Sequence, residues 1–366
     1  MASEELPRPF TQKRLSNMAK RVLTPFRVWL VGLAIATPLA IIIAVAVGAV
    51  AVPFTQVIQI ILAHLLPGTI TPTWTPAADR IVWVFRLPRV LLAVIVGAAL
   101  SVSGTTLQAI ARTPLAAPFV FGVSYGATVG AVLVLTLGAG SFGGISLTLA
   151  AFLGALVAMI LVYLFAQQRG RITPLRLILA GLALSYTFSA FTSYLGLRAS
   201  QRANNQVGLV LSWLAGSFGR ARWEHLGLPA IIVILLTGYL ILQARQLNVL
   251  LMGDERAAGL GIKIERFRIQ MFVITSLMVG AVVAVSGAIG FVGLMVPHIV
   301  RLGVGSDHRQ VLPLAALGGG LFMVIIDLIG RTIIAPEELP VGIVTAAFGG
   351  PFFLWQLRSL YLHEKP

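Results

Sequence analysis

Long apolar segments recur along the chain, and short polar or charged stretches separate them. A helix needs roughly 20 mostly apolar residues to cross the hydrocarbon core of a bilayer. This pattern predicts an all-α, polytopic membrane protein. Nine segments approach or exceed the required length: Val28–Val52, Val90–Ala111, Phe119–Gly138, Ile145–Ala166, Arg176–Leu197, Leu226–Arg245, Arg268–Phe291, Val311–Arg331 and Val341–Leu357.

The composition agrees with a membrane protein. Of the 366 residues, 58% are hydrophobic and only 11% are charged, whereas an ordinary globular domain carries roughly 25% charged residues. A soluble enzyme is therefore not expected, and neither is a disordered chain, which requires low hydrophobicity and high charge. The first apolar segment is longer than the roughly 7–15-residue core of a cleavable signal peptide. We expect it to be retained as a helix that follows a cytoplasmic tail at residues 1–27.

The charged residues decide the number of crossings, because a tenth apolar segment, Val292–Val304, is short. With the N-terminal tail in the cytoplasm, ten crossings place Arg301 and Arg309 inside and Glu337 and Glu338 outside, whereas nine crossings reverse them. Loops on the cytoplasmic side carry an excess of Lys and Arg. We therefore expect about ten helices in one domain, residues 28–360, with both termini and the loop 246–267 in the cytoplasm of an inner-membrane protein. The net charge of +15 then reflects topology rather than nucleic-acid binding.

Two parts of the chain share one sequence pattern. Val96-Gly97-Ala98 and Val102-Ser103-Gly104 recur in the same spacing as Val279-Gly280-Ala281 and Val285-Ser286-Gly287, and the same offset separates Pro114 from Pro297. Ten crossings make the two copies run in opposite directions. The pattern therefore predicts an inverted internal repeat, which is a common transporter architecture.

Two arginines stand where the second predicted helix begins, on the outer side, in the segment Arg86-Leu87-Pro88-Arg89. Proline suits a first helical turn, but cations at the positive end of a helix are electrostatically unfavourable. Two explanations are open: the arginines contact lipid phosphates, or they form bidentate pairs with acidic side chains of a docking partner.

Asp327 is the one carboxylate deep in a predicted span. Charge at membrane depth is costly and is usually paired or functional. Arg331 lies four residues later on the same helix face, which favours a buried ion pair. A proton relay is the alternative, but the sequence offers no second buried acid to continue it.

The longest charged loop contains a short predicted helix. Gly253 and Asp254 are typical of a helix start, Glu255 suits the first turn, and Gly259 or Gly261 can end it. Such a helix suits contact with a soluble partner, and a solvated connector is the alternative.

Small and polar residues mark two further segments. Gly122, Gly126 and Gly130, which follow the helix-breaking Pro114 and Pro118, give a smooth face for close helix packing. The fifth span carries a polar side, which either lines a pathway or forms hydrogen bonds between helices; we select Ser185, Thr187, Ser189 and Thr192 as candidates.

Nucleotide and metal chemistry are not expected in this chain itself. The sequence has no Gly-rich Walker loop ending in Lys-Ser or Lys-Thr, so any ATP that drives it must bind, with Mg²⁺, to a separate subunit. The five histidines are scattered and there is no cysteine. We therefore predict no metal site in this chain; that it binds no cofactor of its own is an expectation that rests on the family resemblance described next.

Several segments, taken together and in order, resemble the FecCD-type permeases, the transmembrane subunits of type II ABC importers for ferric siderophores, haem and vitamin B12. The likeness runs from about Arg86 to Leu357. It is carried by Arg86-Leu87-Pro88-Arg89, the stretches 97–104 and 287–298, Pro114-Leu115-Ala116, Gly122-Val123-Ser124, Gly253-Asp254-Glu255 and the stretch 338–346.

The resemblance implies ten helices, a homodimer or a dimer with a close paralogue, two ATP-binding subunits on one side, and one substrate-binding protein on the other. It implies that Arg86, Arg89 and Arg331 pair with acidic residues of that binding protein. It also implies that a coupling helix contacts the ATPase through Gly253, Asp254, Glu255, Arg256, Ala257, Gly259, Leu260 and Gly261.

The resemblance leaves the cargo open. A ferric siderophore is the leading expectation, haem or vitamin B12 is the alternative, and a proton-coupled secondary transporter or a scaffold protein is a remote one. The stretch 118–126 is bulkier than the usual small-residue version in the family, and we expect it to narrow or reshape the pathway.

Overall fold

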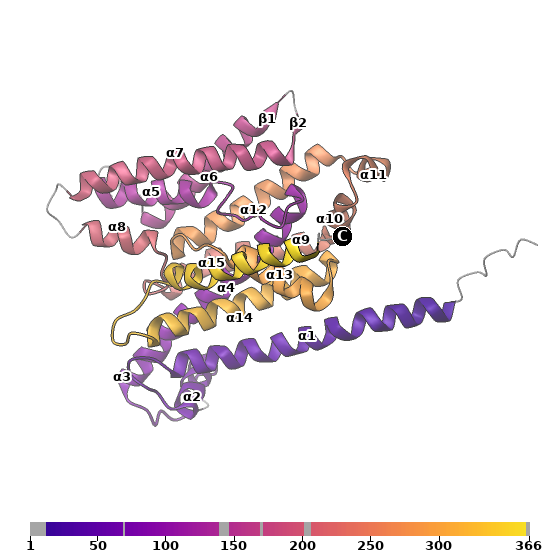
Figure 1. The fold of residues 1–366 in the computed structure, drawn as a ribbon. Helices are drawn as coiled ribbons and strands as arrows, with labels where there is room; N and C mark the ends of the chain where they lie inside the picture. The colour runs from indigo at the N-terminus through magenta and orange to yellow at the C-terminus, as the bar shows by residue number, and fades with distance from the viewer. Residues whose placement is uncertain (1–11, 69, 139–145, 169–170, 201–205, 364–366) are drawn as a thin grey trace, which may run out of the picture.

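A computed structural model describes residues 12–68, 70–138, 146–168, 171–200 and 206–363. Within these residues the fold is a bundle of helices with one hairpin of two short strands, each two residues long (Figure 1). The order is α1 (Gln12–Ala46), α2 (Phe54–Leu65), α3 (Pro76–Asp79), a π-helix (Arg80–Arg86), α4 (Leu87–Ala111), α5 (Val123–Leu137), α6 (Leu147–Ala166), β1 (Gln167–Gln168), β2 (Arg171–Ile172), α7 (Pro174–Ser200), α8 (Gln206–Leu214), a 3₁₀ turn (Trp223–His225), α9 (Gly227–Leu242), α10 (Ala244–Leu251), α11 (Asp254–Gly259), α12 (Ile264–Ser286), α13 (Val292–Val304), α14 (His308–Thr332) and α15 (Val341–His363).

The prediction of a helical polytopic membrane protein is confirmed, and each of the ten predicted spans corresponds to a helix. In the described part of the chain, seven helical stretches are long and apolar enough to cross a bilayer. The remaining three spans match shorter apolar helices, α5, α13 and the apolar part of α15. Helix α5 begins only at Val123 because the preceding stretch contains two prolines and ends at Gly122, whose φ is +77°. Its 15 residues rise only about 22 Å.

Some boundaries differ from the prediction. Helix α1 begins at Gln12, inside the predicted tail, and ends at Ala46 instead of Val52; the first eleven residues of that tail lie outside the described residues. Helices α2 and α8 were not predicted. Helix α4 begins at Leu87 with proline in its first turn, as predicted, but α3 and the π-helix lead directly into it, so Arg86 and Arg89 lie within one continuous helical stretch, Pro76–Ala111.

The two ends of the bundle are distinct (Figure 1). The arginine end is where α1 stops and where Arg86, Arg89 and Arg331 lie. The α11 end is where α4 stops, α10 and α11 lie, and α12 and α14 begin. Helix α1 begins and α15 finishes on the side of the α11 end. This arrangement agrees with an even number of crossings.

Helix α4 forms the centre of the core, because nearly all of its residues are buried. Its glycines allow backbone-to-backbone contact with two neighbours: Gly97 lies against Gly319 of α14, and Gly104 lies against Gly293 of α13. The predicted close packing after Gly122 is also confirmed, because Gly126 and Gly130 lie against Gly154 and Ala150 of α6. Small residues permit these approaches, and dispersion contacts between them stabilise helix pairs in lipid.

The inverted repeat is visible in the packing. The first copy of the pattern lies in α4 and the second in α12, and these helices pack side by side. Arg112, directly after α4, and Arg268, near the start of α12, both contact the Asp254 carboxylate. The end of one helix therefore lies beside the beginning of the other, so the two copies run antiparallel.

Candidate functional site

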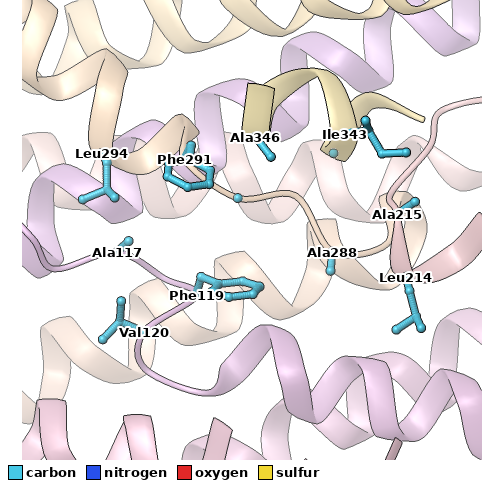
Figure 2. Close-up of a pocket in the computed structure, with 12 residues that line it drawn as sticks. Ala117, Phe119, Val120, Leu214, Ala215, Ala288, Phe291, Leu294, Ile343 and Ala346 are labelled. Atoms are coloured by element: carbon cyan, nitrogen blue, oxygen red, sulfur yellow. The ribbon is translucent and has the colours of Figure 1, made fainter. Parts of the chain in front are cut away.

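An apolar hollow of about 600 Å³ opens between the two repeats (Figure 2). Four parts of the chain form it: the stretch between α4 and α5, the end of α8, the connection between α12 and α13, and the first turns of α15. Figure 2 shows these segments facing a common space. The lining residues are Ala117, Phe119, Val120, Leu214, Ala215, Ala288, Gly290, Phe291, Leu294, Gly342, Ile343 and Ala346.

Breaks in the helices create this hollow. Helix α12 ends at Ser286, directly before Gly287, whose φ is +72°, and α13 begins after Phe291, whose φ is +66°. The Gly287 position has no room for a Cβ atom, because that atom would meet the Trp213 carbonyl. Non-helical backbone at membrane depth is tolerated where it is buried or lines a cavity, and transporters place their binding sites at such breaks.

The lining carries no charged and no hydroxyl side chain. Two aromatic rings, Phe119 and Phe291, face the space from opposite sides (Figure 2). Such a surface holds a large molecule through apolar contact rather than through a fixed set of hydrogen bonds. It can therefore accept a bulky ligand and release it again.

The predicted pathway residues do not line this hollow. Ser185 is buried and donates to the Gly181 carbonyl at 2.7 Å, and Thr187 is exposed and donates to the Ala183 carbonyl at 3.0 Å. Ser189 is partly buried and Thr192 is buried. Two of the four hydroxyls thus donate hydrogen bonds to carbonyls of their own helix, as is common for Ser and Thr. A pathway role for the four residues remains a prediction.

Sequence reasoning found part of the lining and missed the rest. The bulky stretch after Pro118 contributes Phe119 and Val120, as expected from its size. Leu214 and Ile343 carry no distinguishing signal, because an apolar residue in a membrane protein faces lipid, a neighbouring helix or a cavity with equal ease. Only the tertiary arrangement separates these three environments.

Two arginines at the arginine end cap helix α1. Arg86 donates to the carbonyls of Val45 at 2.9 Å and Ala46 at 3.0 Å, and Arg331 donates to that of Ala44 at 2.8 Å. The last carbonyls of a helix lack partners within the helix, and cations are favourable at this negative end. Arg86, which looked unfavourable at the start of a span, thus acts at the end of another helix.

The predicted Asp327–Arg331 ion pair is confirmed, with Nε and Oδ2 3.0 Å apart. The structure adds Arg89, whose Nε lies 2.9 Å from Asp327 Oδ1 and whose Nη1 lies 2.7 Å from Glu338 Oε2. The Asp327 side chain is 1% exposed. Because two arginines engage this carboxylate, a structural role fits it better than a proton relay.

This network changes how the docking prediction must be understood. Arg86, Arg89 and Arg331 are 9%, 8% and 6% exposed, so they are not the open cationic surface that the sequence led us to expect. Only the Glu338 partner is accessible, with 48% of its side chain exposed. A docking role for the three arginines stays a prediction, and for Arg89 it requires that a partner displace Glu338.

The predicted coupling segment forms the expected short helix. Helix α11 starts at Asp254 after Gly253, whose φ is +116°, and it ends at Gly259, two residues before Gly261, whose φ is +82°. Asp254 binds the Arg112 guanidinium and lies 3.2 Å from Arg268 Nη2. This carboxylate therefore joins α11 to the ends of both repeat helices.

The outward face of this segment mixes apolar and charged side chains. Met252 and Leu260 are 58% and 67% exposed, and Glu255 and Arg256 are also exposed, whereas Ala257 is buried against the bundle. Large apolar side chains on a charged surface mark an interaction site. The segment thus has the composition of a protein contact.

Replacement of Asp254 by Ala is expected to loosen α11 without unfolding the bundle. The side chain is half-exposed, so loss of its two arginine partners should reduce the free energy of local opening by about 1 kcal/mol. This corresponds to roughly fivefold faster amide hydrogen exchange in α11. Glu255→Ala is the control, because Glu255 forms no ion pair in the described part of the chain. Equal exchange in the two variants would contradict the assignment.

Together, broken helices around a central hollow and an inverted repeat define a polytopic membrane permease. The chain belongs to the FecCD transport family, whose model matches residues 21–359. It is therefore the permease subunit of an ABC importer, and the resemblance stated from the motifs is confirmed.

Two relatives and one solved structure support this assignment. The haemin transport permease HmuU of Yersinia pestis is 41% identical over 77% of this chain and 85% of its own. The cobalamin import permease BtuC of Halobacterium salinarum is 42% identical over 77% of this chain and 74% of its own. An inward-facing metal-chelate type ABC transporter has a TM-score of 0.78 and 30% identity, covering 90% of this chain and 98% of that one.

Proposed function

We propose that this chain imports a large organic chelate of a metal, with a ferric siderophore as the first candidate and haem or vitamin B12 as equally compatible ones. The observation that carries the proposal is the apolar hollow, whose volume of about 600 Å³ suits a bulky ligand rather than a bare ion. A hydrated cation would favour carboxylate ligands, which no side chain of the described lining offers. The named cargoes of HmuU and BtuC, haemin and cobalamin, support a chelate of this size.

In this proposal two copies of the chain, or one copy and a close paralogue, enclose the pathway in the cytoplasmic membrane, with both termini in the cytoplasm. A substrate-binding protein delivers the chelate at the arginine end. Two ATP-binding subunits dock at the α11 end and hold ATP and Mg²⁺, and this chain contributes no catalytic residue and no cofactor. ATP can shift the inward and outward states only by its different affinity for them.

Growth of a strain that lacks this chain tests which cargo the chain imports. We expect loss of iron-limited growth on a ferric siderophore and recovery on complementation. Loss on haem alone, or loss of cobalamin-dependent growth alone, would identify the corresponding cargo instead. Uptake that persists without any ATP-binding subunit would overturn the importer mechanism and favour a secondary transporter.

A pair of neighbouring alanines tests the hollow. Ala346 lines it and Ala347 does not, although both are exposed in the free chain. Ala346→Phe should place a ring in the pathway and reduce the uptake rate at least about tenfold, which corresponds to roughly 1.4 kcal/mol in the barrier. Ala347→Phe should transport nearly as the unmodified chain does. If both variants transport equally, the hollow is not the pathway.

A further inference from the structure

A second pocket, unrelated to the apolar hollow, lies at the α11 end beside the predicted coupling segment. Its volume is about 320 Å³. Gln108 and Arg112 reach it from the end of α4, Leu251 from the end of α10, and Arg301 from α13. Helix α14 begins at its edge, so four elements of both repeats converge there.

Arg301 gives this pocket a positive charge that the chain does not balance. Its Nη1 donates to the neutral Gln108 Oε1 at 2.6 Å, and in the described part of the chain it forms no ion pair with a carboxylate. Two acids at this end of the bundle are engaged elsewhere: Asp254 binds Arg112 and Arg268, and Asp307 accepts from Asn248 at 2.6 Å and from the Arg309 backbone at 3.0 Å.

His308, which also lines the pocket, supplies a second observation. It is 1% exposed, and its Nδ1 lies 2.7 Å from Asn248 Oδ1. In the part of the chain that the structure describes, its Nε2 has no hydrogen-bond partner. Because Nδ1 donates to the Asn248 oxygen, Nε2 is an acceptor that a donor such as water would satisfy. Buried polar groups are almost always paired, so the pocket is incomplete, and the counter-ion that Arg301 lacks is what calls for an acidic group.

The surroundings indicate where the missing group comes from. Leu251, a lining residue, is 44% exposed and continues into the exposed apolar side chains of Met252 and Leu260. Arg256 and Lys263 are exposed on the same segment. An occupant that covers this surface must combine apolar contacts with negative charge, which is the character of a protein surface rather than of a free anion.

We infer that an acidic side chain of the ATP-binding subunit enters this pocket and pairs with Arg301. The inference rests on the proposed function, because it requires that this subunit docks at the α11 end. A partly buried charge pair fixes the register of two surfaces as well as adding affinity. Arg301 would therefore align the ATPase with α11, and the apolar residues would supply contact area.

The test measures binding of the purified ATP-binding subunit to the full chain held in nanodiscs. Arg301→Gln should weaken binding at least about tenfold, because loss of one partner leaves the other charge unpaired. Gln108→Glu should weaken it similarly, since the new carboxylate occupies Arg301 from within the chain. Arg309→Gln is the matched control, because Arg309 is an exposed arginine at the same end that does not line the pocket.

The outcomes are distinct. If Arg301→Gln and Gln108→Glu bind the ATPase as the unmodified chain does, the inference is wrong even though the proposed function stands. If both variants keep ATPase affinity but lose co-purifying phosphatidylglycerol, the pocket holds a lipid phosphate instead. If the unmodified chain binds no ATP-binding subunit, the proposed function fails together with the inference. Thermal unfolding of each variant, expected to match the unmodified chain, excludes misfolding as the cause.

Discussion

Asp327→Asn is expected to destabilise the protein by about 3–5 kcal/mol, because it removes the carboxylate that Arg89 and Arg331 share. Both guanidinium groups remain buried, at 10% and 5% side-chain exposure, and only Arg89 keeps a carboxylate partner, the half-exposed Glu338. Arg331 also holds the end of α1. We therefore expect the junction of α1, α4 and α14 to open first.

Glu338→Gln is the matched control. Both acids bind Arg89, but the Glu338 side chain is 48% exposed, and an exposed pair contributes only about 0–1 kcal/mol. The apparent melting temperature in detergent, read with the fraction of monodisperse protein, should fall strongly for Asp327→Asn and little for Glu338→Gln. Equal losses would mean that burial of the pair does not determine its importance.

Gly319→Ala is expected to disrupt the contact between α4 and α14 and to cost about 1–3 kcal/mol or more, as over-packing does. An added Cβ atom would overlap the Gly97 carbonyl and Ser101 Oγ. The first of these is backbone of a buried helix and cannot move alone. The two helices would have to separate, and dispersion contacts along their length would weaken.

The adjacent glycine provides the control. A Cβ atom at Gly318 would meet Val296 Cγ1 at 3.5 Å, which is an ordinary contact, so Gly318→Ala should be neutral or slightly stabilising because alanine favours a helix. Expression level, monodispersity and melting temperature distinguish the two variants. A stable Gly319→Ala protein would show that the close approach is not needed for the fold.

The sequence alone predicted the ten spanning helices, but it predicted their boundaries poorly and missed α2 and α8. The length of the apolar segments predicts α4, α9 and α12, because a helix must be long enough to cross the bilayer. It could not find α2, nor the true start of the stretch Pro76–Ala111, because short helices carry no such length signal. The short α13 was found through charge distribution, which reports sidedness rather than length.

The candidate sites likewise divide into features that the sequence predicted and features that only the structure revealed. Gly253 and Asp254 indicated α11 because helix ends obey local rules of capping and backbone conformation. The Asp327–Arg331 pair was also visible, since four residues bring two side chains onto one helix face. The sequence did not predict that Arg89 joins this ion pair, because no local spacing relates Arg89 to a residue of α14.

The sequence by itself determined the class of protein, the helical spans, the inverted repeat and the family, since these follow from hydropathy, charge and local motifs. The tertiary structure decided which residues line the hollow, that Arg86 and Arg331 are buried as caps for α1, and that Arg301 has no counter-ion among the described residues. Those features depend on which helix faces meet. Because nearly every helix face in this chain is apolar, the hydrophobic pattern does not determine which faces meet, and the packing geometry does.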